Sequence, residues 1–250
     1  MSDSNFPILY KDEHLVAIDK PAGILVHRSN IDRQESRFVL QELRNQLDLR
    51  VYPIHRLDKP TSGILMFGLD TDSAALLSKQ FAQREVLKRY WMLCRGYTPD
   101  ADEIDYALVP RDEFKSRNKK LGKEVVVKPA QEAVTTFKTL ASVEIPVLID
   151  KYPASRYSLV EAQPKTGRKH QLRRHFKHIS HPIIGDPRYG KSTHNRYFSE
   201  NLGCDRLLLH AQYVSFRHPI SKQSVEIQCM PNGIFNDVLG QLNLMPEQES

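Results

Sequence analysis

Cysteine is scarce in this sequence, which has three cysteines at positions 94, 204 and 229. They are far apart and odd in number, so they form neither a disulfide framework nor the paired spacing of a zinc site. No apolar run approaches the roughly 20 residues that a membrane-spanning helix needs. Residues 1–7 also lack a cationic segment followed by an apolar one, so they do not form a secretory signal. We therefore expect a soluble protein without membrane association, located in the cytoplasm.

Acidic residues are outnumbered in the chain of 250 residues, which has 36 Lys and Arg against 30 Asp and Glu, a formal net charge of +6. This balance suits a polyanionic partner, and nucleic acid is the commonest one. Residues 111–128 hold seven Lys or Arg against three acids. This segment either lies along a polyanion or is a solvated loop, and its composition fits both.

Strands dominate the predicted secondary structure. Short apolar runs bounded by turn residues predict them over residues 8–10, 15–19, 24–27, 51–54, 64–69, 88–97, 133–140, 157–162, 207–216 and 225–228. Helical spacing of apolar residues predicts helices over 37–49, 70–85, 168–179 and 234–242. Residues 98–130 show no clear pattern.

This order of elements predicts an α+β fold with a mixed, largely antiparallel sheet and flanking helices, rather than a doubly wound sheet. The chain shows no repeat of fixed period and no clear interdomain linker. We therefore expect residues 1–250 to form a single domain.

Acids are absent from residues 165–178, which contain six Lys or Arg and three His. Leu172, Phe176 and Ile179 fall on one helical face and are expected to be buried. The basic side chains are then left for exposed or cleft-facing positions: Arg168, Lys169, Arg173, Arg174 and Lys177. An all-positive helix repels itself, which favours a phosphate-binding role over a merely solvated face. The expected anion site is at the predicted helix start, Thr166-Gly167.

A metal is not expected at the three histidines of this segment, His170, His175 and His178, because no carboxylate or cysteine accompanies them.

The segment around Asp58 is the strongest candidate for chemistry. Two predicted strands flank it, and Lys59-Pro60-Thr61-Ser62-Gly63 has the composition of a tight turn. Asp58 should stand at the mouth of this turn, with His55, Arg56 and Lys59 nearby to keep its carboxylate ionised. An ionised, positioned Asp can serve as nucleophile, general base or metal ligand, although a surface ion pair at a turn remains an alternative.

The same segment resembles a known signature. His55-Arg56-Leu57-Asp58 followed by Thr61-Ser62-Gly63 is similar to the motif of the RluA-type pseudouridine synthases. Further matches follow in the same order along the chain: Lys88-Arg89-Tyr90, Thr166-Gly167-Arg168-Lys169-His170-Gln171-Leu172-Arg173, His181-Pro182-Ile183-Ile184-Gly185-Asp186 and Leu207-Leu208-Leu209-His210-Ala211.

The resemblance implies the pseudouridine synthase catalytic fold with a central RNA-binding cleft. It implies that Asp58 is catalytic, that Arg173 pairs with it and that Tyr90 stacks on the target uracil. Arg56 would help to displace the target base, and Leu208 or Leu209 would pack against the tyrosine. Some family members carry an N-terminal RNA-binding module, which we do not expect here because the first predicted strand begins near residue 8.

The implied reaction is the isomerisation of uridine to pseudouridine in RNA, which requires no cofactor. Phosphate contacts are expected from Arg168, Lys169 and Arg174. The motif wording favours tRNA as the substrate, with a T-stem uridine at position 65 as the target, and we expect a monomer. Two alternatives remain open: a ribosomal RNA pseudouridine synthase of the same family, and a non-catalytic RNA-binding module.

Overall fold

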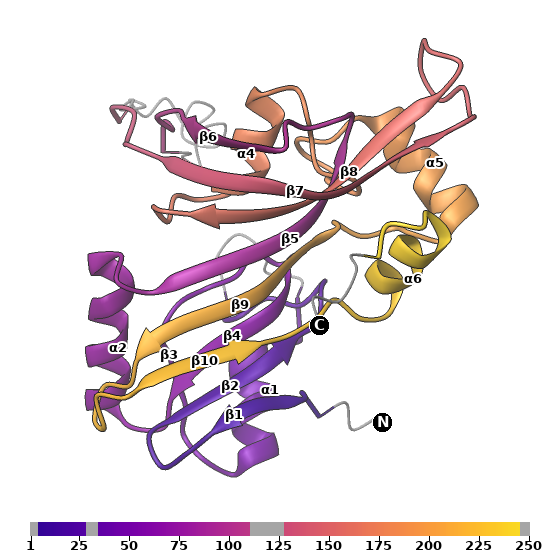
Figure 1. The fold of residues 1–250 in the computed structure, drawn as a ribbon. Coiled ribbons are helices and arrows are strands. Elements are labelled where there is room, and N and C mark those ends of the chain that lie inside the picture. Colours follow the sequence, from indigo (N-terminus) through magenta and orange to yellow (C-terminus); the bar gives the residue numbers. More distant parts are fainter. Residues whose placement is uncertain (1–4, 29–34, 111–127, 246–250) are drawn as a thin grey trace, which may run out of the picture.

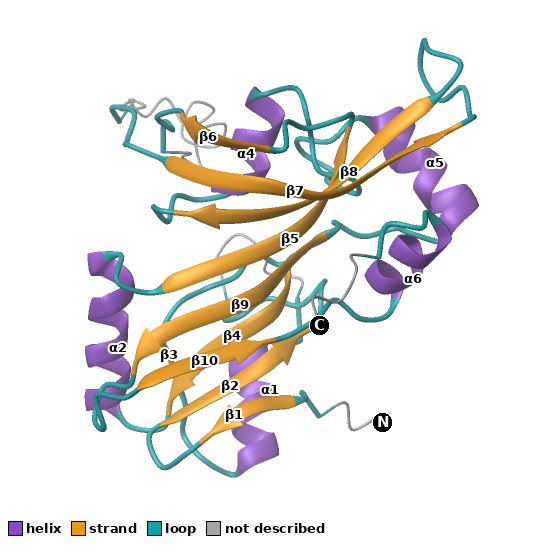
Figure 2. Ribbon diagram, viewed as in Figure 1, coloured by secondary structure: helices purple, strands orange, loops and turns teal. Residues whose placement is uncertain are grey.

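A single ten-stranded sheet forms the centre of the computed structural model, which describes residues 5–28, 35–110 and 128–245 (Figures 1 and 2). The main strand order is β1-β2-β4-β9-β5-β8-β7-β6, with β3 paired to β4 and β10 paired to β9. The strands are β1 (Ile8–Lys11), β2 (Leu15–Lys20), β3 (Tyr52–Pro53), β4 (Ser62–Gly68), β5 (Leu87–Arg95), β6 (Ala101–Asp105), β7 (Val134–Ile145), β8 (Ser155–Pro164), β9 (Leu209–Arg217) and β10 (Ser224–Gln228).

All strand pairs are antiparallel except β4–β9, which confirms the predicted mixed, largely antiparallel α+β fold. The parallel contact depends on Gly63, whose φ is +103°. A Cβ on Gly63 would lie 2.3 Å from the Ala211 carbonyl oxygen of β9. Only glycine therefore allows the strand that follows the Asp58 turn to approach β9 this closely.

Helices cover both faces of the half of the sheet that contains β2 and β4. Helix α1 (Val39–Leu47) packs Val39 and Leu43 against Val16 and Ile18 of β2. Helix α2 (Thr71–Gln83) covers the opposite face, and the Asp70 carboxylate caps it by accepting a 2.7 Å hydrogen bond from Ser73 N. Because both faces are covered, every residue of β2 and β4 is buried.

The other half of the sheet is covered by α4 (Gln171–His178) on one face and by α5 (Ser192–Leu202) and α6 (Ile234–Gln241) on the other. Strand β5 alternates between these clusters: Met92 faces Phe176 of α4, whereas Trp91 packs with the cluster that contains Phe198 of α5. Tyr90 lies on the α4 side, like Met92. Its position in β5 therefore directs the ring toward the segment that carries the basic residues.

Most predicted elements are confirmed, but the strand predicted over residues 24–27 is wrong. Ile24 and Val26 are buried like strand residues, yet the Leu25 and Val26 carbonyls accept hydrogen bonds of 2.9 and 3.0 Å from Val39 N and Leu40 N. The segment therefore satisfies the first amides of α1 instead of pairing with a strand.

The predicted start of the basic helix at Arg168 is also wrong. His170 has a left-handed backbone conformation, φ 55°, which an α-helix interior excludes, and α4 begins only at Gln171. The sequence prediction also missed β6 and α5. The basic segment 111–128 lies outside the described residues except for Lys128. In the described part of the chain, no helix has the length and apolar character needed to span a bilayer.

Candidate active site

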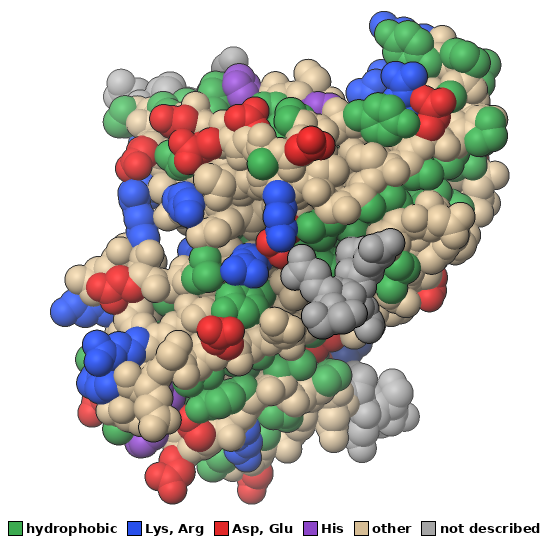
Figure 3. All heavy atoms as spheres, viewed as in Figure 1, with side chains coloured by type: hydrophobic (Ala, Val, Ile, Leu, Met, Phe, Trp, Pro, Cys, Tyr) green, Lys and Arg blue, Asp and Glu red, His purple; other side chains and the backbone are tan. Residues whose placement is uncertain are grey.

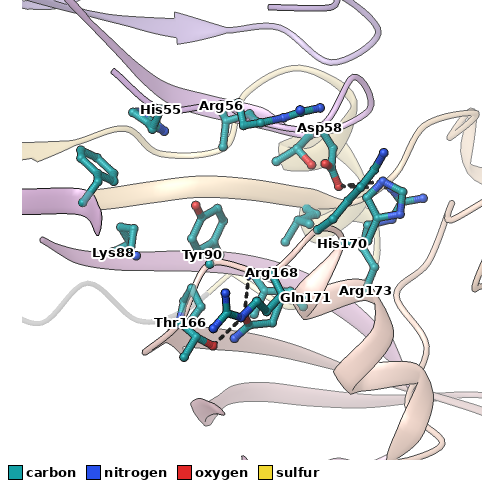
Figure 4. Close-up of a pocket in the computed structure, with 18 of the residues that line it drawn as sticks. His55, Arg56, Asp58, Lys88, Tyr90, Thr166, Arg168, His170, Gln171 and Arg173 are labelled. Atoms are coloured by element: carbon teal, nitrogen blue, oxygen red, sulfur yellow. Dashed lines mark hydrogen bonds and ion pairs between the residues drawn. The ribbon is translucent and has the colours of Figure 1, made fainter. Parts of the chain in front are cut away.

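A pocket of about 500 Å³ brings the predicted site residues together. The 55–61 segment, the end of α2, strand β5, the 164–173 segment and Leu209 line it. Figure 4 shows the arrangement: Asp58, His170 and Arg173 lie together at one end, Tyr90 lies in the middle, and His55 and Lys88 lie toward the other end. In Figure 3, Lys and Arg side chains gather around the hollow between the two halves of the molecule.

Lys20 stabilises the turn that carries Asp58 through hydrogen bonds to backbone carbonyls. Thr61 N donates a 3.0 Å hydrogen bond to the Asp58 carbonyl, which closes the predicted turn. The fully buried Lys20 ammonium donates to the carbonyls of Pro21, Lys59 and Thr61 at 2.7, 3.2 and 2.8 Å. Burial, together with the nearby charge of Arg206, lowers the pKa of Lys20 to about 7. Sequence reasoning assigned no role to Lys20, although Lys20-Pro21 lies in a recognisable turn.

Arg173 is the principal cation at the Asp58 carboxylate. Its Nη1 lies 3.2 Å from Asp58 Oδ2, and the Asp58 side chain is 19% exposed. The local cations expected at this position do not supply the pairing: Lys59 instead pairs with Glu35, and Arg56 is exposed. The charge that accompanies Asp58 therefore comes from a distant segment.

A second acid, Asp186, fixes the orientation of Arg173. The Nε and Nη2 atoms of Arg173 donate to the two oxygens of Asp186 at 2.7 and 2.8 Å. The backbone amides of Arg188 and Tyr189 donate to Asp186 Oδ1 at 2.9 and 3.0 Å. Burial acts to raise the pKa of Asp186, but the hydrogen bonds and charge of Arg173 outweigh it and hold the pKa below its usual value. Asp186 ends the motif His181-Pro182-Ile183-Ile184-Gly185-Asp186, but no function could be predicted for it from the sequence.

His170 completes the surroundings of Asp58 without adding a charge. Its Nε2 lies 3.7 Å from Asp58 Oδ2, and its Nδ1 lies 2.9 Å from the Tyr189 hydroxyl. Burial lowers the pKa of His170 to about 4, so the imidazole is neutral at pH 7. Arg173 therefore supplies the positive charge at this carboxylate.

Tyr90 presents an aromatic ring to the same pocket. Burial, with a contribution from the negative charge of Asp58, raises the pKa of Tyr90, so the phenol stays protonated at neutral pH. Leu209 lines the pocket and belongs to the cluster against which Tyr90 packs, whereas Leu208 belongs to the cluster beneath α5 and α6. Strand alternation alone left this choice open, and the structure places Leu209 next to the tyrosine.

The predicted phosphate-binding residues are not all in the pocket. Arg56, Arg168 and Lys169 line it, but Arg174 lies outside it and is half-buried on α4. Arg168 Nε donates a 2.9 Å hydrogen bond to the Glu132 carbonyl, which ties this arginine to the segment before β7.

Thr166-Gly167 does not form the expected helix N-terminus. Thr166 is buried, and its hydroxyl donates to Gln171 Oε1 at 2.7 Å. The same oxygen accepts a 2.9 Å hydrogen bond from Arg168 N, while Gln171 Nε2 donates to Val134 O and Thr135 Oγ1 at 3.0 Å. This buried glutamine therefore holds the segment 166–170 against β7, a function that sequence reasoning missed.

One group of metal-type ligands lies outside the pocket. Asp19, His210 and Cys229 bring potential ligand atoms within 4.8 Å of one another. However, the two His210 nitrogens lie 2.8 Å from Ser62 Oγ and the Cys229 carbonyl, and Asn232 donates to Asp19 at 2.7 Å. Burial raises the pKa of the Cys229 thiol to about 12. These side chains form a hydrogen-bonded network, so they do not fit a metal centre.

Comparison with known proteins finds relatives over most of the chain. Residues 14–178 match the family described as RNA pseudouridylate synthase. The chain is 49% identical over 224 residues to tRNA pseudouridine synthase C of Haemophilus ducreyi, covering 89% of this chain and 90% of that protein. It is 44% identical over 234 residues to the enzyme of the same name from Vibrio cholerae, covering 94% of each. The structure of human RNA pseudouridylate synthase domain containing 4 superposes with a TM-score of 0.71 at 27% identity, covering 96% of this chain and 95% of that one.

Proposed function

The chain belongs to the RNA pseudouridylate synthase family, and from this we propose that it isomerises a uridine of tRNA to pseudouridine with Asp58 as the catalytic residue. In this reaction the bond between the ribose C1′ and N1 of uracil breaks, and a bond between C1′ and C5 forms. The C5 hydrogen is released, and N1 ends with a proton. Electrons and atoms balance within the nucleoside and water, so the reaction needs no redox partner or group donor.

The observation that carries the proposal is the Asp58–Arg173 pair at one end of a pocket that also contains Tyr90. The Arg173 guanidinium would compensate the charge of the Asp58 carboxylate when a bound nucleoside displaces water from it. Asp58 would then either attack the nucleoside or remove a sugar proton. Tyr90 would stack on the uracil, and Arg56 would help to displace the base from its helix.

The names of the relatives favour tRNA as the substrate. Both relatives described above are called tRNA pseudouridine synthase C, and this chain covers nine-tenths or more of each. A T-stem uridine at position 65 is the target we propose. Ribosomal RNA is the competing substrate, because the catalytic motifs are shared across the family and do not describe the shape of the RNA.

We further propose that residues 1–250 act as one catalytic domain, as a monomer, in the cytoplasm. A continuous sheet through both halves supports the single domain. The buried thiols of Cys94, Cys204 and Cys229 are free, which suits a reducing compartment that also holds tRNA.

Release of tritium from C5-labelled uridine tests this function. The wild type should release tritium from tRNA and not from ribosomal RNA, and Asp58→Asn should lower the rate by about a thousandfold or more. Mass-spectrometric mapping of the modified tRNA should find one pseudouridine, at position 65. Retained turnover in Asp58→Asn would refute the catalytic assignment. A non-catalytic RNA-binding module would instead lose function only when Arg168, Lys169 and Arg174 are neutralised.

A further inference from the structure

Lys88 is a cation of the pocket that the mechanism above does not use. It lies on β5 two residues before Tyr90, and its side chain lines the same pocket. Among the residues that the structure describes, Asp58 is the acid that lines this pocket, and Arg173 already pairs with it. Among the described residues, no carboxylate lies within ion-pair distance of the Lys88 ammonium. Its Nζ lies 5.9 Å from the centroid of the Phe81 ring.

The rings of Phe81 and His55 lie near the Lys88 side chain, and neither ring carries a charge. The His55 ring stacks on Phe81 with a centroid distance of 4.6 Å and an interplanar angle of 11°, and its Nε2 accepts a 3.1 Å hydrogen bond from Met66 N. Burial, followed by the charge of Lys88, lowers the pKa of His55 to about 3, so this imidazole is neutral. Burial also lowers the pKa of Lys88. Partial burial of an ammonium raises the free energy of the folded protein unless an anion pairs with it.

We propose that Lys88 binds a backbone phosphate of the RNA nucleotide next to the target uridine. This inference rests on the proposed function and extends it by naming a second contact in the same pocket. Lys88 and Tyr90 both line the pocket, although the register between β5 and β9 shifts between Arg89 and Tyr90. Figure 4 places Lys88 on the side of Tyr90 away from Asp58. A uracil stacked on Tyr90 therefore leaves its neighbouring phosphodiester within reach of the ammonium.

The next residue provides a matched control. Arg89 lies between Lys88 and Tyr90 but on the other face of β5, where its guanidinium stacks 4.7 Å from the Tyr213 ring centroid. Arg89 does not line the pocket. Lys88→Met and Arg89→Met therefore remove the same charge from adjacent positions on opposite faces.

Binding of unlabelled tRNA over a salt series tests the inference. We expect Lys88→Met to weaken binding about tenfold at low salt and to reduce the slope of log Kd against log salt by about 0.7–0.9, the value of one phosphate contact. Lys88→Arg should restore both quantities, and Arg89→Met should change neither. If Lys88→Met does not fold, Lys88→Gln makes the same comparison. An unchanged salt slope in a folded, neutral variant would overturn the proposal.

A change in the RNA identifies the phosphate. Single methylphosphonates on either side of the target uridine in a T-arm hairpin should include one that weakens binding by the wild type but not by Lys88→Met. The contact would be contradicted if, at every position, the methylphosphonate weakened binding by Lys88→Met by the same factor as it weakened binding by the wild type. These are binding measurements, so they can fail while the wild type still releases tritium. Lack of turnover on any RNA would instead refute the proposed function.

Discussion

Arg173 and Asp58 lie 115 residues apart in the sequence, yet Arg173 Nη1 is 3.2 Å from Asp58 Oδ2. The contact uses one edge of the guanidinium, because the other edge is held by Asp186 in a two-point interaction of 2.7 and 2.8 Å. Asp186 is therefore a positioning residue: it acts on the proposed chemistry by fixing the group that pairs with Asp58.

Replacing Asp186 by Asn should reduce both activity and stability. The variant leaves the buried Arg173 without its main partner, and breaking a buried ion pair from one side costs about 3–5 kcal/mol. We expect a loss of this size in the free energy of unfolding by urea and a fall of about 10- to 100-fold in kcat, with a smaller effect on KM. Asp150→Asn, which breaks the partly exposed pair with Lys191 outside the pocket, should change neither. Wild-type kcat in Asp186→Asn would contradict the positioning role.

The same pair predicts how stability depends on pH. The pKa of Asp186 is lower in the folded protein than in the unfolded chain, where it is about 3.9. Its contribution is therefore complete above that unfolded value and is lost as the pH falls through the folded pKa. Urea unfolding between pH 7 and pH 2 should show a steeper acid loss of stability in the wild type than in Asp186→Asn. If the wild type and Asp186→Asn lost stability in parallel as the pH fell, another group would control the loss of stability in this pH range.

Tyr90 should act mainly through its ring. Tyr90→Phe keeps the stacking surface, whereas Tyr90→Leu removes it, and base–aromatic stacking contributes about 1–3 kcal/mol. We expect Tyr90→Phe to keep tritium release within about tenfold of the wild type and Tyr90→Leu to lose about a hundredfold. Because the pKa of Tyr90 is raised, the wild-type rate should show no ionisation of this phenol between pH 7 and pH 9. Equal losses in both variants would assign the effect to the hydroxyl instead.

Leu208 and Leu209 provide a test of the support beneath Tyr90. Both are buried, but Leu209 lines the pocket and Leu208 packs on the other face. Each Leu→Ala change should destabilise the fold by about 2–5 kcal/mol. At a temperature where both variants are folded, only Leu209→Ala should reduce tritium release, because only it leaves a cavity next to Tyr90. A similar loss of turnover in Leu208→Ala would mean that a general loss of core packing, and not the cavity next to Tyr90, lowers the activity of both variants.

Sequence patterns predicted the elements whose apolar residues repeat clearly. The strands β1, β2, β9 and β10 and the helix α2 were predicted this way and are confirmed. The edge strand β6 was missed because its sequence, Ala-Asp-Glu-Ile-Asp, has a single buried residue, Ile104. Helix α5 was missed because its buried residues are only His194 and Phe198, too few to mark an apolar face.

The residues of the candidate site also divide into those that the sequence identified and those that it did not. The resemblance identified Asp58 and Arg173 as partners, and the structure brings them together. Lys20, Asp186 and Gln171 could not be assigned, because each acts on a neighbour that is distant in sequence or on backbone carbonyls and amides. Such contacts leave no periodic signal, and only the folded chain reveals them.

Glu132 faces two arginines at the rim of the pocket. Its carboxylate accepts hydrogen bonds of 3.3 and 3.0 Å from Arg84, and its backbone carbonyl accepts one from Arg168. Both arginines line the pocket, and the Glu132 carboxylate pairs with the Arg84 guanidinium there. We expect an RNA phosphate that contacts Arg84 to compete with this carboxylate.

Glu132→Gln should therefore bind tRNA more tightly, by about three- to tenfold at low salt, because Arg84 no longer has a charged competitor. The gain should shrink as salt rises, since it comes from a phosphate contact. Glu144→Gln is the matched control: it breaks the exposed pair with Arg156, which does not line the pocket, and should leave affinity unchanged. Filter binding at 50 and 200 mM salt separates the outcomes. Weaker binding by Glu132→Gln would mean that the carboxylate instead holds Arg84 in the orientation that RNA requires.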